Sequence, residues 1–206
     1  MRTLRTAYAA ILLLVTGVAI PSQAADAQGQ SPSEFIEAVA QIAIQAANNK
    51  SISLVERQRI FEELLNTKFD IPQIASFVLG QYWQMANDVD RETFTEAFRN
   101  YVLRSYSSRF FGYAGESLRV LGHRASNTNG TVVYTEIGEQ GAGTALKLEW
   151  RVVDRGGYKI IDLSVSGISM AITKREEFAS VLRRNGGDLP SLTRQLDIVA
   201  TAQSSK

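Results

Sequence analysis

The residues that could do acid–base chemistry are few in this chain. It contains a single histidine, His123, and no cysteine. A Cys–His pair, a zinc-finger spacing or a multi-histidine metal site therefore cannot be built. His123 could act as a general base, but it follows a predicted strand beside Arg124 in a turn-rich stretch. This setting is typical of a solvated or structural histidine, so we predict no catalytic residue and no metal site here.

The carboxylates on predicted strands are Glu136, Glu149 and Asp162. Asp162 interrupts an otherwise apolar strand and could be a buried acid. Carboxylates are rarely buried unless they are paired, so we predict that Asp162 faces the polar side of its sheet or pairs with an arginine. The Gly-rich stretch at 141–143 lies between two predicted strands rather than between a strand and a helix, which argues against a nucleotide site. No cofactor is predicted.

The first residues have the pattern of a secretory signal peptide. Arg2 and Arg5 precede an apolar run at 7–20, and small residues follow it, so we expect cleavage after Ala24 or Ala27. No later apolar run approaches the length that spans a bilayer. We therefore predict a signal peptide at 1–27 and one exported domain at 28–206, most simply periplasmic and without stable membrane insertion.

The net charge limits the class of partner. The formal net charge is +1, and removal of the signal peptide with Arg2, Arg5 and Asp26 leaves the two signs equal. Nucleic-acid binding needs a concentrated basic surface, so nucleic acid is excluded as an expected partner. The same balance argues against permanent electrostatic adhesion to anionic lipid.

Helical periodicity dominates the first half of the mature chain. Ser31 and Ser53 begin two predicted helices by capping-box patterns, and Asp70 begins a third that stops at Gly80. A long helix follows from Arg91, with Asp90 as the predicted N-cap. Its face carries a broad aromatic stripe at three- and four-residue intervals. We expect this stripe to pack against the β-rich block that follows it in the sequence.

From Ser117 the hydrophobic period changes to two. Four strands are predicted, at 117–121, 131–137, 145–154 and 158–166, followed by helices at 173–184 and from Asp188. In the third strand Leu148 and Trp150 face one way, and Lys147 and Glu149 face the other. The predicted fold class is α+β: a single domain in which a twisted antiparallel meander of about four strands packs against N- and C-terminal helices. Spacing alone leaves open whether its aromatic side chains fill a core or line a large apolar pocket.

Five stretches of the region 69–196 resemble the MlaC family, the toluene-tolerance-type periplasmic phospholipid-binding proteins. They are FVLGQYW (77–83), FTEAFRNYV (94–102), GYKIIDL (157–163), SGISM (166–170) and EFASVLRR (177–184). Two stretches, SMAIT (169–173) and REEF (175–178), are similar to the hopanoid-associated HpnM branch. Gln81 stands where the family commonly has a basic residue, which puts a headgroup role at this position in doubt.

The resemblance implies a soluble carrier of a phospholipid or a hopanoid-type lipid. In the family, such a carrier moves lipid between an inner-membrane ABC transporter complex and an outer-membrane lipoprotein complex. It also implies a fold that encloses an apolar cavity for the acyl chains. The candidate lipid-binding residues are Phe77, Tyr82, Trp83, Tyr101, Tyr106, Phe110, Leu148, Trp150, Val152, Ile161, Leu163 and Val165.

Two alternatives from other classes stay open at this point. One is an enzyme of cone-shaped α+β fold in which Asp162 and His123 both point into a pocket. The other is an envelope interaction module of a hopanoid or lipid export system that binds protein and has no ligand of its own.

Overall fold

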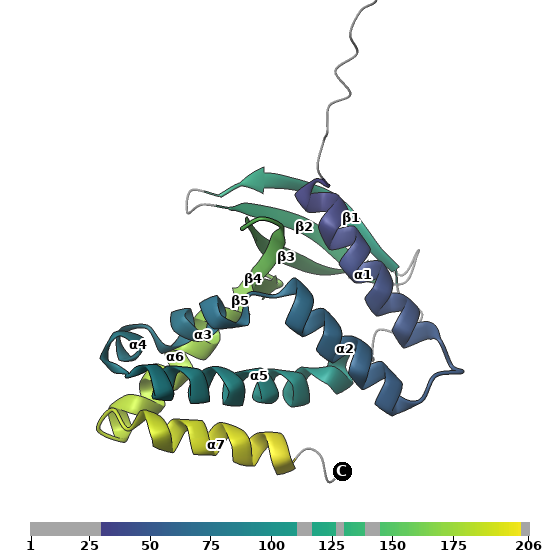
Figure 1. The fold of residues 1–206 in the computed structure, drawn as a ribbon. Coiled ribbons are helices and arrows are strands. Elements are labelled where there is room, and N and C mark those ends of the chain that lie inside the picture. Colours follow the sequence, from purple (N-terminus) through teal and green to yellow (C-terminus); the bar gives the residue numbers. More distant parts are fainter. Residues whose placement is uncertain (1–29, 111–116, 127–129, 139–144, 203–206) are drawn as a thin grey trace, which may run out of the picture.

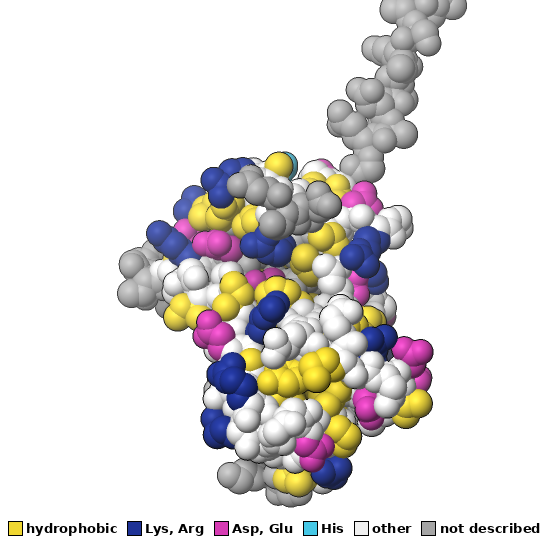
Figure 2. All heavy atoms as spheres, turned by 90° about the vertical axis from the view of Figure 1, so that its left-hand side faces the viewer, with side chains coloured by type: hydrophobic (Ala, Val, Ile, Leu, Met, Phe, Trp, Pro, Cys, Tyr) yellow, Lys and Arg dark blue, Asp and Glu magenta, His cyan; other side chains and the backbone are white. Residues whose placement is uncertain are grey.

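The computed structural model describes residues 30–110, 117–126, 130–138 and 145–202, and Figure 1 shows their arrangement. The predicted signal peptide and the Gly-rich stretch at 141–143 lie outside the described residues. Seen from the end that holds α3, α4 and α6, the surface mixes hydrophobic side chains with charges of both signs (Figure 2).

Seven helices and five strands make up the described residues, as the predicted α+β class requires. The helices are α1 (Pro32–Asn48), α2 (Leu54–Lys68), α3 (Ile71–Leu79), α4 (Gln81–Met85), α5 (Asp88–Phe110), α6 (Met170–Arg184) and α7 (Leu189–Ala202). The strands are β1 (Ser117–Ala125), β2 (Thr131–Gly138), β3 (Leu146–Asp154), β4 (Tyr158–Val165) and β5 (Ile168–Ser169). All neighbouring strands are antiparallel, in the order β1-β2-β3-β4-β5, which confirms the meander and adds one short strand.

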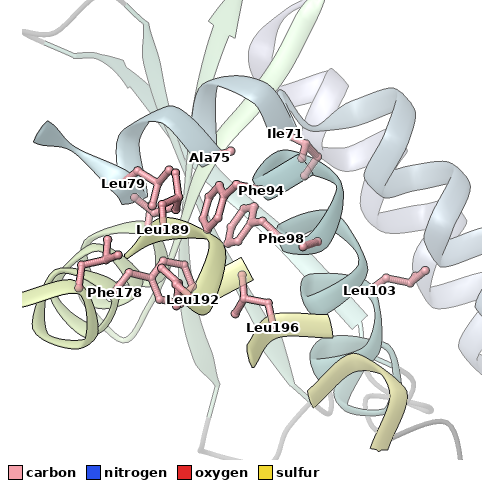
Figure 3. Close-up of a cluster of buried hydrophobic side chains, with 14 of the residues drawn as sticks. Ile71, Ala75, Leu79, Phe94, Phe98, Leu103, Phe178, Leu189, Leu192 and Leu196 are labelled. Carbon is pink, nitrogen blue, oxygen red and sulfur yellow. The ribbon is translucent and has the colours of Figure 1, made fainter. Parts of the chain in front are cut away.

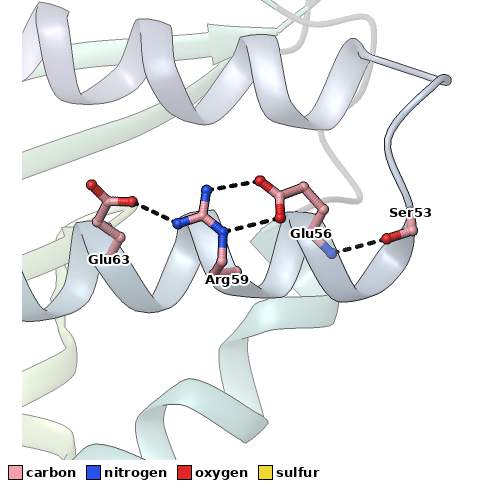
Figure 4. A network of polar contacts seen from close by, with 4 residues as sticks. All are labelled: Ser53, Glu56, Arg59 and Glu63. Atoms are coloured by element: carbon pink, nitrogen blue, oxygen red, sulfur yellow. Dashed lines mark hydrogen bonds and ion pairs between the residues drawn. The ribbon is translucent and has the colours of Figure 1, made fainter.

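Side-chain caps fix the starts of α1 and α2 where the sequence predicts them. Ser31 accepts from the Glu34 amide at 3.2 Å, and Glu34 accepts from the Ser31 amide at 2.7 Å. The hydrogen bond from the Ser31 amide to the Glu34 carboxylate is the main cause that lowers the pKa of Glu34 below its usual value, and the bond with the Ser31 hydroxyl is the second. At α2 the Ser53 hydroxyl accepts from the Glu56 amide at 3.1 Å, whereas the Glu56 carboxylate accepts from Arg59 rather than closing a capping box. Arg59 joins Glu56 to Glu63 along the exposed face of α2 (Figure 4).

Two predicted helix starts are wrong by a few residues. Asp90 is not the N-cap of the long helix, because the Asn87 side chain accepts from the Asp90 amide at 2.9 Å and α5 begins at Asp88. Asn caps as well as Asp does, and Asp90 then lies in the first turn, where the helix dipole favours its charge. Likewise α6 begins at Met170 rather than Thr173, since the Ser169 hydroxyl accepts from the Ile172 amide.

The helices form a core of their own, which we call the helical core. Phe94 and Phe98 of α5 contact Phe178 of α6 edge-on, with ring centroids 6.0 and 6.2 Å apart. Leu192 and Leu196 of α7 complete this cluster (Figure 3). The expectation that the α5 stripe packs mainly on the sheet is therefore wrong: α7 runs along α5 and covers it (Figure 1). The apolar face of α7, near the C-terminal end of the sequence, packs on α5 in place of the sheet.

Gly80 connects α3 to α4 in a conformation that favours glycine. Its φ is +56° and its ψ is −122°, and an added Cβ would lie 3.0 Å from the guanidinium of Arg175.

We predict that Gly80→Ala destabilises the protein by about 1–3 kcal/mol, because a side chain in this region of backbone space is strained. Urea denaturation of the purified variant measures the change. A free energy of unfolding equal to that of the unsubstituted protein would contradict the conformation assigned to this turn.

Candidate functional site

One face of the sheet is apolar across all four long strands, and we call it the inner sheet face. On β3 the side chains of Leu148, Trp150 and Val152 are buried, as predicted. Val133 and Ile137 of β2 lie on the same face. Phe35, Ile36, Val39 and Ala43 of α1 pack on it. The opposite face is charged: Arg119 pairs with Glu136 across β1 and β2 at 2.6 Å.

In the part of the sheet that the structure describes, the buried centre of the inner sheet face carries no charged side chain. Its buried polar group is Thr135, which is 1% exposed. Its hydroxyl accepts a hydrogen bond from the indole nitrogen of Trp150 at 2.9 Å. The indole nitrogen and the buried hydroxyl therefore satisfy each other, as buried polar groups usually do.

The edge of the inner sheet face is only half-buried. The side chains that form this apolar rim are Leu118, Val120, Leu146, Leu163 and Val165, all packed against the buried centre. Large apolar side chains left half exposed beside a buried apolar surface favour an apolar ligand. The rim includes the predicted residues Leu163 and Val165, and it is the part of the inner sheet face that an acyl chain could contact without displacing the core.

A bulge changes the predicted facing of one candidate. Arg151 pairs with Asp162 while Val152 pairs with Ile160, so Ile161 is an extra residue between them. Ile160 is fully buried in the core beneath the inner sheet face, and Ile161 is not among the residues that pack there. Strict alternation predicted Ile161 on the inner face, which is wrong because a bulge shifts the side-chain period by one residue. A role for Ile161 in lipid contact stays untested.

The aromatic candidates on the helices lie apart from the buried centre of the sheet. Tyr82, Trp83, Tyr101 and Tyr106 are half-buried against the helical core, whereas Trp150 belongs to the core under the sheet. Phe77 is 40% exposed on α3. Phe110 is the last residue of α5, and its side chain is outside the described part. The predicted set is thus divided between two cores, which Phe69 bridges.

Two grooves open on the helical part of the molecule. The α3–α6 groove, of about 430 Å³, includes Phe77 among its lining residues. The α2–α5 groove, of about 670 Å³, includes Trp83, whose ring lies 5.6 Å from the Arg91 guanidinium. Neither groove is lined by a strand residue. The enclosed apolar cavity between sheet and helices therefore stays a prediction.

A lysine is placed beside one of the aromatic candidates. The Lys174 ammonium donates to the Tyr101 hydroxyl at 2.7 Å and to Glu177 at 2.6 Å. Burial, the largest single effect, lowers the pKa of Lys174, but the bonds to Glu177 and Tyr101 together outweigh it, and the pKa is raised. Lys174 therefore remains charged where it joins Tyr101 of α5 to Glu177 of α6.

The two residues of the enzyme alternative are not together. His123 is exposed on β1 and its Nδ1 lies 2.8 Å from the Ser33 hydroxyl; β1 extends to Ala125, so His123 is within the strand rather than beyond it. Asp162 is on β4, with β2 and β3 between, so three strand spacings of about 4.8 Å separate the two strands by roughly 14 Å. This separation argues against a joint catalytic role.

Asp162 instead holds the start of α6. It accepts from the Ser169 hydroxyl at 2.6 Å and from the Ala171 amide at 3.0 Å. The prediction that it faces the polar side is consistent with its position opposite Arg151 in the register, but its partners are a helix start rather than an arginine. Sequence reasoning missed this because the β5 turn brings Ser169 back beside β4.

We predict that Asp162→Ala destabilises the protein by about 2 kcal/mol, since hydrogen bonds to a charged group are worth roughly 1.5–3 kcal/mol. Lipid loading should be unchanged. Thermal unfolding and lipid extraction measure the two effects. Loss of a catalytic turnover in a variant that still folds and binds lipid would contradict this structural role.

Two further observations bear on function. Within the described ranges, no cluster of three or more His, Asp or Glu residues is arranged to hold a metal ion. Nor does any described helix combine the length and hydropathy that crossing a membrane requires.

The sequence places Leu146 on the same face as Leu148 without identifying it as a lipid contact, and it leaves the rim residues Leu118 and Val120 unassigned. The signal was present, because Leu118 and Val120 alternate with Arg119 on β1. That strand is short of apolar residues and is bulged between Val120 and Gly122, so its inner face was not assigned.

Comparison with known proteins gives a consistent result. The family model described as MlaC protein matches residues 33–197. A solved structure of the phospholipid-binding protein from Ralstonia solanacearum, in complex with a phospholipid, is similar in fold with a TM-score of 0.73. The two sequences are 17% identical, and the match covers 84% of this chain and 98% of that chain.

Proposed function

Because this chain belongs to the MlaC family, we propose that it is a lipid carrier that binds a phospholipid by its acyl chains. The observation that carries the proposal is the apolar rim. It presents half-exposed aliphatic side chains beside a buried centre without charge. The phospholipid held by the Ralstonia protein of similar fold supports the same ligand class.

The physical cost of exposing acyl chains sets the requirement for such a carrier. Two chains contain about 30 methylenes, and at about 0.8 kcal/mol each their exposure to water would cost on the order of 24 kcal/mol. A diffusible carrier must therefore cover most of both chains. For the same reason it cannot release them into bulk water at a useful rate, and it must load and unload while docked on a membrane-bound partner.

The docking partners that we propose are those that membership of the MlaC family implies. The protein takes up and delivers lipid at two docking partners, an inner-membrane ABC transporter complex and an outer-membrane lipoprotein complex, and diffuses through the periplasm between them. The cargo is a phospholipid, or a hopanoid-type lipid if the chain belongs to the HpnM branch.

Lipid uptake from vesicles tests the binding proposal directly. Delipidated protein is incubated with vesicles that contain labelled phosphatidylglycerol and phosphatidylethanolamine, with or without a bacteriohopanepolyol, and is then separated from them by gel filtration. We expect labelled lipid to elute with the protein. Protein that remains free of all these lipids after prolonged incubation would contradict the proposal and favour the interaction-module alternative.

A further inference from the structure

The α3–α6 groove is an open surface that contains the lipid candidate Phe77 but no residue of the apolar rim. Phe77 of α3 forms one wall, and α6 supplies Ile172, Arg175, Glu176, Ala179 and Arg183. Phe77 and Ile172 are 40% and 50% exposed. The groove lies on the face that α3, α4 and α6 form, where hydrophobic side chains are exposed among Lys and Arg side chains (Figure 2).

The groove is built on a second face of α6. The first face buries Ala171, Phe178 and Leu182 in the helical core. The second face carries its lining residues at three- and four-residue intervals, with the small Ala179 in the middle. A small residue between larger neighbours leaves a depression, and this explains why the helix surface is hollowed there.

Two guanidinium groups are available at the groove. Arg175 lies over the Phe77 ring at 5.0 Å and donates to the Phe77 carbonyl at 3.4 Å. In the part of the chain that the structure describes, neither Arg175 nor Arg183 forms an ion pair. The neighbouring Arg184 donates instead to Ser180 and is outside the groove lining.

We propose that the α3–α6 groove binds an amphipathic helix of a partner protein, with its apolar side chains against Phe77, Ile172 and Ala179 and its carboxylates against Arg175 and Arg183. The lining stripe from 172 to 183 is about 16 Å long at 1.5 Å per residue. This length fits about three turns of a helix in a groove. Arg175 and Arg183 are about 12 Å apart along α6 by the same rise, so the matching carboxylates are two turns apart on the partner helix.

The shape and charge of the groove favour a helix over a lipid surface. A flat bilayer could touch the rims of the groove but could not reach Ala179 on its floor. A continuous anionic headgroup layer would also meet the Glu176 carboxylate, which lines the groove between the two arginines. A helix can place its carboxylates at Arg175 and Arg183 and keep them away from Glu176. The proposal does not rest on lipid carriage, since the groove and the inner sheet face share no residue.

A synthetic peptide pair tests the proposal by fluorescence anisotropy with the full mature chain. The first peptide is an amphipathic helix about four turns long, with a leucine stripe flanked by glutamates two turns apart. The second has lysine in place of each glutamate. We expect the acidic peptide to bind and the basic peptide not to bind. The expected weakening is about threefold for Arg183→Gln and about tenfold for the double Arg175→Gln/Arg183→Gln variant.

Arg184→Gln is the matched control, because it removes the same charge from the next position of α6. It should change the affinity by less than twofold. Ala179→Glu should abolish binding by filling the floor with a carboxylate, and Ala179→Ser controls for substitution at that position. Circular dichroism verifies that each variant is folded.

Several results would overturn the proposal. They are failure of the acidic peptide to bind, equal binding of both peptides, or unchanged affinity in folded Ala179→Glu. Sedimentation with phosphatidylglycerol vesicles that depends on Arg175 and Arg183, without peptide binding, would reassign the groove to a lipid surface. Lipid uptake is measured in parallel: we expect the groove variants to keep it, so failure of this proposal and failure of the carrier proposal are distinguishable.

Discussion

Replacing Leu163 by Asn should weaken phospholipid binding about a hundredfold while the protein stays folded. Leu163 is half-buried in the apolar rim of the inner sheet face. Removing an apolar side chain from contact with an acyl chain costs about 1.5–3 kcal/mol, and leaving an amide without a partner there adds about 1–3 kcal/mol. The two costs together are about 2.5–6 kcal/mol, and a value near the lower limit, about 2.8 kcal/mol, corresponds to a hundredfold change in an equilibrium constant.

The measurement is partitioning of labelled phospholipid between the protein and vesicles. A carrier takes lipid from membranes and also returns it, so we expect the labelled lipid to be divided between protein and vesicles in comparable amounts. A hundredfold change in the partition constant is then measurable. Ser164→Asn is the matched control, because the next residue of β4 faces the other side of the sheet. Equal partitioning for both variants would remove the rim from the lipid site.

Replacing Phe178 by Ala should destabilise the protein by about 3–5 kcal/mol, the usual cost of truncating a buried aromatic side chain. Phe178 is 2% exposed. It contacts Phe94, Phe98 and Tyr101 edge-on from α6, and such pairs add to the energy of burial alone. Because the native state of a domain is stable by only about 5–15 kcal/mol, this single change should bring the protein close to unfolding.

Urea or thermal denaturation measures this loss. Ile172→Ala on the same helix is the control, since its side chain is 50% exposed and its truncation should cost less than about 1 kcal/mol. A Phe178→Ala variant as stable as the control would show that α6 is not an integral part of the helical core.

The sequence allowed the elements to be predicted better than their packing. Local signals such as the Ser31 capping box and the alternation along β3 act over a few residues, and the structure confirms both. Which helix covers the α5 stripe is a competition between distant segments. Periodicity shows that α5 and α7 each have an apolar face, but it cannot show that they meet.

The same distinction applies to the candidate site. Leu148, Trp150 and Val152 share the predicted face because strict alternation holds along β3. The alternation fails at Ile161, because a β-bulge shifts the register there. No residue type in this part of β4 indicates the bulge. Asp162 was placed on the polar side, but its bond to the start of α6 depends on the β5 turn. Contacts of this kind, between segments that only the fold brings together, cannot be predicted from the residue pattern of one strand.

Native mass spectrometry of the mature protein, purified from the periplasm without detergent, shows whether it carries a lipid. We expect a protein mass increased by that of one bound lipid, and identification of the lipid released on denaturation separates a phospholipid from a hopanoid. A protein without bound lipid, which also takes up none from vesicles, would contradict the carrier proposal.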